Sequence, residues 1–215
     1  MNPVTGGAAA SMNSVTDGAA MNVHPIVCLG DSIAASGWPE ALEKLMRGRG
    51  WQDIHVFNAG VRGNTSTQGL KRLEQDVIAR KPGIVFIQFG FNDCNVILNG
   101  PRPRTQPARF GDNLKTLVDR IRKQSAAPIL IANHSTLVTR VLPDGRSYEQ
   151  HSQEYSAITA AVAGQTGTPL LDMRRRFPGS GVSLREALAE DGIHLSAAGI
   201  DCYARIVADY LVAAS

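Results

Sequence analysis

The sequence predicts an α/β fold in which helices cover both faces of a parallel β-sheet, a three-layer α/β/α sandwich. From residue 24 onward, short apolar runs alternate with segments of helical periodicity, the pattern of strand–helix–strand units in a parallel sheet. Polar motifs directly follow three of the expected strands, at the edge where such sheets bind ligands. We expect five strands in the order 2-1-3-4-5.

Each expected strand is a short apolar run, and each expected helix repeats apolar residues at three- or four-residue spacing. The expected strands are 25–29, 54–57, 84–89, 128–132 and 169–171. The expected helices are 38–47, 70–78, 114–121, 155–162 and 203–211. The run 84–89 is the most apolar, which predicts a central strand buried on both faces. Ser196 is the expected N-cap of the last helix.

The length of 215 residues fits one domain with a tail. Residues 1–22 are rich in Gly, Ala, Ser, Asn and Thr without periodicity, which predicts a disordered tail rather than a secretory signal peptide. The domain is expected over 23–215. Cys28, Cys94 and Cys202 are odd in number and lack metal-ligand spacing, so we interpret them as reduced thiols of a cytoplasmic protein.

Composition excludes several classes of protein. The formal charge is only +3, with no dense Lys/Arg stripe, which disfavours nucleic acid as a partner. No apolar run has the length of a membrane span. No Walker-type phosphate loop and no Gly-x-Gly-x-x-Gly fingerprint is present, so no cofactor is expected. The sequence does not indicate an oligomeric state.

Three residues in the order Ser, Asp, His carry the chemistry of a nucleophilic hydrolase. Ser32 ends the motif Gly30-Asp31-Ser32 after the first strand, and Asp191 precedes His194 by three positions before the last helix. A serine hydroxyl is a weak nucleophile and needs an adjacent base with an orienting group. The expected nucleophile is therefore Ser32, the base His194 and its orienter Asp191.

An oxyanion also needs hydrogen-bond donors aimed at it. The expected donors are the N–H of Ser32, the N–H of Gly60, whose missing side chain permits close approach, and the side-chain amide of Asn92. Asp31 and Asp93 are expected to support the site structurally by binding N–H groups of their own loops.

These motifs resemble the SGNH hydrolases, also called the GDSL esterase and lipase superfamily, over about residues 24 to 213. Four blocks match in order: Gly30-Asp31-Ser32, Gly60, Gly90-Phe91-Asn92-Asp93 and Asp191-Gly192-Ile193-His194. The resemblance implies a flavodoxin-like sandwich and a serine esterase that forms an acyl-enzyme on Ser32. It also implies the triad and oxyanion roles given above. Ile33 stands where the family usually has leucine, a conservative exchange.

Several alternatives remain open. Each block alone is weak, because Gly-Asp-Ser also forms ordinary turns and Asp-x-x-His also forms capping pairs. Asp31, Asp191 and His194 are a less favoured carboxylate–His–carboxylate metal site. A lysophospholipase, a thioesterase, an acyltransferase and a non-catalytic carbohydrate- or lipid-binding relative are further alternatives.

Two long connections are expected to border the site. Residues 94–108 follow the Asn92 block and contain Arg102 and Arg104, candidate substrate-binding residues whose simpler interpretation is a solvated basic loop. Residues 134–153 follow the fourth strand and form the second expected wall. Neither connection carries a broad apolar surface. We therefore expect a small-molecule ester substrate with a short acyl group, such as an O-acetylated sugar.

Overall fold

The computed structural model describes residues 25–96 and 102–214. These residues form the expected three-layer sandwich around a parallel sheet in the order β2-β1-β3-β4-β5. The predicted strand order is therefore confirmed. The strands are β1 (Ile26–Gly30), β2 (Val56–Gly60), β3 (Ile84–Gln88), β4 (Ala127–Ala132) and β5 (Leu170–Asp172). The predicted tail, residues 1–22, lies outside the described residues.

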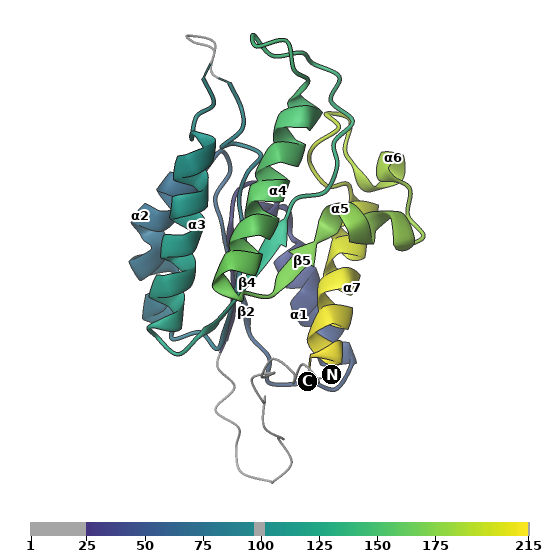
Figure 1. Cartoon of the computed structure of the whole chain (residues 1–215). Helices are drawn as coiled ribbons and strands as arrows, with labels where there is room; N and C mark the ends of the chain where they lie inside the picture. Colours follow the sequence, from purple (N-terminus) through teal and green to yellow (C-terminus); the bar gives the residue numbers. More distant parts are fainter. Residues whose placement is uncertain (1–24, 97–101, 215) are drawn as a thin grey trace, which may run out of the picture.

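Helices cover both faces of this sheet (Figure 1). One face carries α1 (Trp38–Gly48) and α7 (Ala197–Ala213), which pack against each other, and the other carries α2 (Ser66–Asp76), α3 (Pro107–Arg122) and α4 (Tyr148–Thr166). The short elements are α5 (Met173–Arg176), α6 (Leu184–Ala187) and the 3-10 turns η1 (Ala34–Ser36), η2 (Ile78–Arg80) and η3 (Phe177–Gly179).

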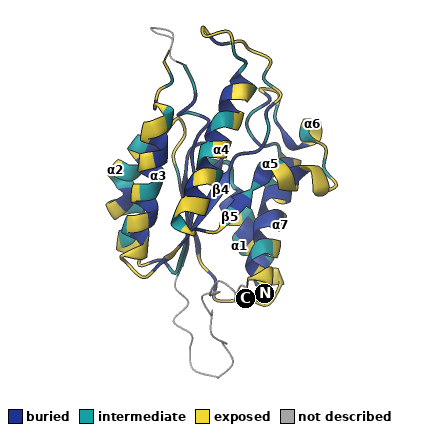
Figure 2. Ribbon diagram, viewed as in Figure 1, coloured by how far each residue is buried: buried dark blue, intermediate teal, exposed yellow. Residues whose placement is uncertain are grey.

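The core follows from the apolar patterns of the sequence. All five residues of β1 are buried, because this strand lies between β2 and β3 and beneath helices on both faces. Figure 2 shows the helices with buried residues toward the sheet and exposed residues outward. Trp38 and Tyr203 are fully buried with ring centroids 5.1 Å apart, and they join α1 to α7. No helix in 25–96 or 102–214 has the length and apolarity to cross a bilayer.

Helix α4 begins seven residues before the predicted range 155–162. Its N-cap is Ser147, whose side chain accepts from the N–H of Gln150 while the Gln150 side chain accepts from the N–H of Ser147. The first turns of α4 bury polar side chains, including His151 and Ser152, so they lack an apolar stripe. The capping box was the signal that marked the true start.

The contact between α6 and α7 fixes the position of the start of α7. Ser196 caps α7 as expected, accepting from the N–H of Gly199 at 3.1 Å. The N–H of Ser196 donates to the carbonyl of Ala187 at 3.0 Å. Gly199 lies against the same carbonyl, and a Cβ at this position would come within 1.9 Å of that oxygen. Only glycine permits this approach.

We expect Gly199→Ala to lower the free energy of unfolding by about 1–3 kcal/mol, because the added methyl overpacks the joint between α6 and α7. Gly164→Ala in α4 is the matched control, since a Cβ there meets nothing within 4 Å. The control should leave stability unchanged or raise it by up to about 1 kcal/mol. Urea unfolding of both variants measures the difference, and equal effects would contradict this account of the joint.

Candidate active site

Strand register brings the sequence motifs to one edge of the sheet. Gly30 at the end of β1 is paired with Gly60 of β2 and with Gln88 of β3. Since parallel strands in register end at the same level, the turns that follow them begin side by side. The residues after Gly30, Gly60 and Gln88 therefore meet there.

A continuous chain of hydrogen bonds joins Ser32, His194 and Asp191. The Oγ of Ser32 lies 2.9 Å from Nε2 of His194, and Nδ1 of His194 lies 2.5 Å from Oδ2 of Asp191. When Nδ1–H donates to the carboxylate, Nε2 is the acceptor for the serine hydroxyl. The structure therefore brings together the three residues that the sequence singles out as nucleophile, base and orienter.

The carboxylate of Asp191 is held in the ionised form. Partial burial alone raises its pKa, but hydrogen bonds from the His194 ring and from the N–H groups of Ile193 and His194 outweigh burial and lower it to about 2. Asp191 thus carries a negative charge throughout the working pH range. An ionised carboxylate orients the imidazole and stabilises the imidazolium that proton transfer creates.

His134 supports the turn that carries His194. No motif in the sequence indicates this role. Its Nε2–H donates to the carbonyl of Ile193 at 2.9 Å, and its ring is fully buried against Phe91 and Phe177. Burial lowers the pKa of His134 to about 4, partly opposed by the bond to Ile193. The ring is therefore neutral near pH 7 and positions the residue next to His194.

Ser32 lies in a braced turn between β1 and η1. The Oδ1 of Asp31 accepts from the N–H of Ile33 at 2.9 Å, the loop-binding role expected for this aspartate. Gly60 of the neighbouring strand lies under the same turn, where a Cβ would come within 2.2 Å of the Ala35 nitrogen. Glycine at position 60 therefore lets β2 approach the turn that carries the serine.

The N–H of Gly60, one of the expected oxyanion donors, has another partner in the structure. It donates to Oδ1 of Asn58 at 2.9 Å. The next turn contains Gly63, at φ +76°, and no acceptor for its N–H is found in the described part of the chain. Sequence reasoning passed over Gly63 because the earlier glycine directly ends the strand.

Asn92 reaches the cavity, as expected. Its Nδ2 donates to the carbonyl of Asn64 at 3.1 Å, and its side chain also hydrogen-bonds with Asp31, which lowers the pKa of that carboxyl against the effect of burial. The adjacent Asp93 is buried and accepts from both the N–H and the hydroxyl of Ser66 at the start of α2. Burial raises the pKa of Asp93, with the bonds from Ser66 opposing it. Asp93 thus ties the loop after β3 to α2.

A cavity of about 380 Å³ opens above Ser32 and His194. One wall comes from the loop after β3, through Phe91, Asn92 and Asn95. The opposite wall comes from the predicted second connection, and its members are Val138, Arg140 and Tyr148. Asp191 and Ile193 complete the lining. Apart from Ser32, His194 and Asp191, the lining thus consists of apolar, aromatic and amide side chains together with Arg140.

Arg102 and Arg104 are exposed and lie outside the group of residues that line this cavity. Within the described ranges, no three His, Cys, Asp or Glu side chains are placed to hold a metal ion. Asp31 is directed to its own loop by the bond from Ile33, while Asp191 and His194 bind each other. This geometry favours the triad over a metal site.

The fold and the connected serine, histidine and aspartate at the carboxyl ends of the strands define the class of serine hydrolases. The comparisons with known proteins agree with this class. The model of the GDSL-like lipase/acylhydrolase family matches residues 28–201. The chain belongs to this family and is a carboxylic ester hydrolase.

Individual relatives share 30% or less of their sequence with this chain in the examples that follow. Esterase TesA of Pseudomonas aeruginosa is 30% identical over 176 residues, which cover 79% of this chain and 78% of that protein. The crystal structure of a lipase/acylhydrolase from Enterococcus faecalis has a TM-score of 0.74 at 26% identity, covering 87% of this chain and 95% of that one. The acetyl xylan esterase AlAXEase has the same fold, with a TM-score of 0.74 at 19% identity and coverage of 87% and 99%.

The buried carboxyl of Asp31 predicts an unusual dependence of stability on pH. Burial raises its pKa to about 7, partly opposed by the Ile33 N–H and assisted by the charge of Asp93. Between about pH 4 and 7 the folded state therefore holds a proton that the unfolded state has released. Raising the pH across this interval removes the stability that depends on that proton.

Asp31→Asn keeps the acceptor for Ile33 and removes the titration. We expect the free energy of unfolding of the variant, relative to the wild type, to increase by up to about 1.4 kcal/mol per pH unit between pH 5 and 7. Above pH 7 the difference should level off. Urea unfolding at a series of pH values measures it. A difference that stays constant from pH 5 to 8 would contradict the raised pKa.

Proposed function

We propose that this protein is a serine esterase that cleaves short-acyl carboxylic esters through an acyl-enzyme on Ser32. The observation that carries the proposal is the unbroken hydrogen-bond chain from Ser32 through His194 to Asp191 at the base of the cavity. Ser32 attacks the ester carbonyl as His194 takes its proton. His194 then protonates the leaving alcohol, and a water molecule activated by His194 releases the acid.

The oxyanion is held by the N–H of Ser32, the amide of Asn92 and the N–H of Gly63. Gly63 takes the place of Gly60 as the proposed oxyanion donor because the N–H of Gly60 already donates to the Asn58 side chain. It is also supported by the contact between Asn92 and the carbonyl of Asn64, which draws the turn containing Gly63 toward the amide. Donors fixed before the reaction stabilise the developing charge without reorganisation.

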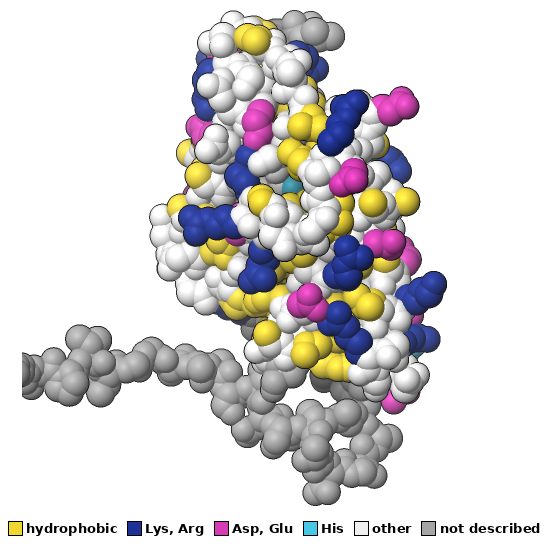
Figure 3. Space-filling model, turned by 90° about the vertical axis from the view of Figure 1, so that its right-hand side faces the viewer, with side chains coloured by type: hydrophobic (Ala, Val, Ile, Leu, Met, Phe, Trp, Pro, Cys, Tyr) yellow, Lys and Arg dark blue, Asp and Glu magenta, His cyan; other side chains and the backbone are white. Residues whose placement is uncertain are grey.

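The short-acyl preference rests on the size and walls of the cavity. The cavity has a volume of only about 380 Å³, and its walls combine apolar side chains with the polar Asn95 and Arg140. On the face seen in Figure 3, apolar side chains are scattered among charged ones rather than joined in one broad patch. The acetyl xylan esterase with the same fold acts, by its name, on acetyl esters. An O-acetylated sugar fits these features.

Purified protein should hydrolyse 4-nitrophenyl acetate and butyrate faster than the decanoate, and a chelator should not change the rate. Ser32→Ala should remove turnover while leaving the unfolding transition in place, because only the nucleophilic oxygen is lost. A maximum at decanoate would instead favour the lysophospholipase or thioesterase alternative. Equal turnover by Ser32→Ala and the wild type would contradict the serine mechanism. If the wild type bound esters without turnover, a non-catalytic binding module would be favoured.

Asn92→Ala should lower kcat by about 10²–10³, corresponding to about 2.7–4 kcal/mol of lost transition-state stabilisation. KM should change little, because an oxyanion donor acts mainly in the transition state. Steady-state kinetics with 4-nitrophenyl acetate provide the measurement, and the circular dichroism spectrum checks the fold. An effect confined to KM would show that Asn92 binds the ground state instead.

A further inference from the structure

Arg140 is a charged residue of the cavity wall that the sequence motifs do not indicate. Among the described residues that line the cavity, it is the one Lys or Arg side chain. It comes from the connection between β4 and α4, opposite the loop after β3. The acid in the same lining, Asp191, is already engaged by His194 and two N–H groups. Arg140 therefore adds a positive charge beside the reacting serine.

The contacts of Arg140 leave its charge uncompensated. Its Nη2–H donates to Oδ1 of Asn95 at 3.1 Å, and its Cζ lies 5.5 Å from the centroid of the Tyr148 ring. Both partners are neutral, and no carboxylate of the described chain lies within ion-pair distance of this guanidinium. By contrast, Arg146 in the same connection pairs with Glu154 at 2.7 Å.

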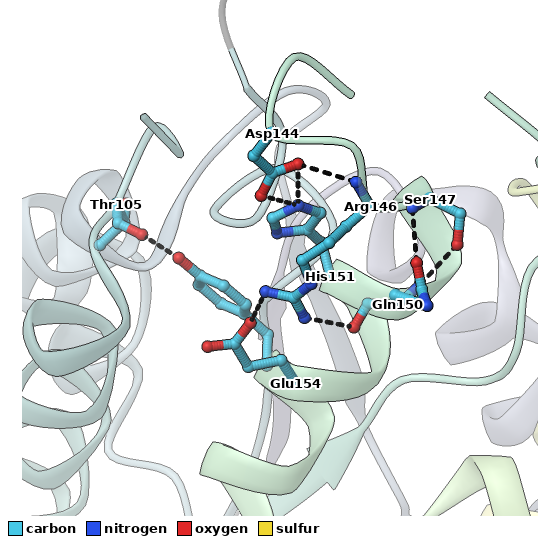
Figure 4. A network of polar contacts seen from close by, with 8 residues as sticks. Thr105, Asp144, Arg146, Ser147, Gln150, His151 and Glu154 are labelled. Carbon is cyan, nitrogen blue, oxygen red and sulfur yellow. Dashed lines mark hydrogen bonds and ion pairs between the residues drawn. The ribbon is translucent and has the colours of Figure 1, made fainter. Parts of the chain in front are cut away.

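The backbone that carries Arg140 is held in place. The carbonyl of Arg140 accepts from the N–H of Tyr148 at 2.9 Å. Farther along the connection, Asp144 binds the buried ring of His151 on α4, and Arg146 binds Glu154 (Figure 4). A cation on a braced segment loses little further freedom when it binds a ligand.

The chemistry of the side chain indicates the ligand. A guanidinium presents several N–H donors in a planar fork that matches a carboxylate or a phosphate. Asn95 and Tyr148 hold the fork beside the cavity while leaving most of its donors free. An anionic group there would meet an exposed cation at the cavity wall. No carboxylate in the described part of the chain lies within ion-pair distance of it.

We propose that Arg140 determines specificity by binding a carboxylate or phosphate group on the ester substrate. This inference rests on the proposed esterase function and narrows its substrate class to esters that carry a negative charge near the scissile bond. The anionic group can belong to the acyl part or to the alcohol part of the ester, and substrates of both kinds distinguish the two.

Two matched pairs of esters provide the test. For the acyl side, mono-4-nitrophenyl succinate is compared with neutral 4-nitrophenyl butyrate. For the alcohol side, 4-acetoxybenzoate is compared with its neutral methyl ester. We expect the wild type to prefer the anionic member of one pair by kcat/KM. Rising salt should weaken that preference, because the attraction is electrostatic.

Arg140→Gln should lower kcat/KM for the preferred anionic ester by about ten- to a hundredfold, mainly through KM. Turnover of the neutral ester should change less than about twofold. Arg140→Lys should restore part of the preference, since it restores the charge without the fork. Asn95→Asp should also remove the preference, because its carboxylate pairs with Arg140 in place of the substrate.

The matched control is Arg109→Gln, which removes the same charge from an exposed position on α3 away from the cavity. It should leave both ratios unchanged. Equal losses with anionic and neutral esters in Arg140→Gln would overturn the inference and leave Arg140 a structural residue. A wild type without preference in either pair would also overturn it while the esterase function stands. Failure to hydrolyse any of the four esters would overturn the esterase function itself.

Discussion

The site depends on one long-range contact, the hydrogen bond between Ser32 and His194. The two residues are 162 positions apart in the chain, and each belongs to a different turn. Ser32 is placed by the end of β1. His194 is placed by the start of α7, whose docking on α1 through Trp38 and Tyr203 sets its position. Packing on this face therefore controls the distance on which proton transfer depends.

Close approach is the second requirement, and small residues provide it. Gly60 lets β2 lie against the turn that carries Ser32, while Gly199 lets α7 lie against the carbonyl of Ala187. In both places the contact is with backbone, so a larger side chain has no flexible neighbour to displace. The catalytic turn and the histidine turn are thus supported by backbone contacts, which hold geometry more tightly than mobile side chains.

Charge is distributed unevenly through the site. Asp31 and Asp93 lie buried beneath it, where burial raises the pKa of both carboxyl groups. Arg140 lies at the cavity wall without an acidic partner. Buried carboxyl groups that are unfavourable for stability are typical of functional sites. Here they brace the turns that carry Ser32 and Asn92, whereas Arg140 faces the space that a substrate would occupy.

The sequence by itself determined the fold class and the family, because these depend on local apolar periodicity and on short motifs next to strand ends. The expected strand order needed the structure for its confirmation, because pairing between strands leaves no local signal. The pairing of Ser32, His194 and Asp191 could also be predicted, since the order and spacing of the motifs are characteristic. The start of α4 was missed because its first turns bury polar side chains such as His151.

Only the tertiary structure decided which residues form the walls of the cavity and which hydrogen bonds the residues around the serine make. The Asn58 side chain accepts from the N–H of Gly60, and His134 donates to the carbonyl of Ile193. Arg140 lines the cavity without an acidic partner in the described part of the chain. The bonds of His134 and Arg140 join segments that are distant in the chain, and that of Gly60 depends on where Asn58 turns its side chain. Such contacts have no periodicity in the sequence, because they arise from packing between elements rather than from the conformation of any one of them.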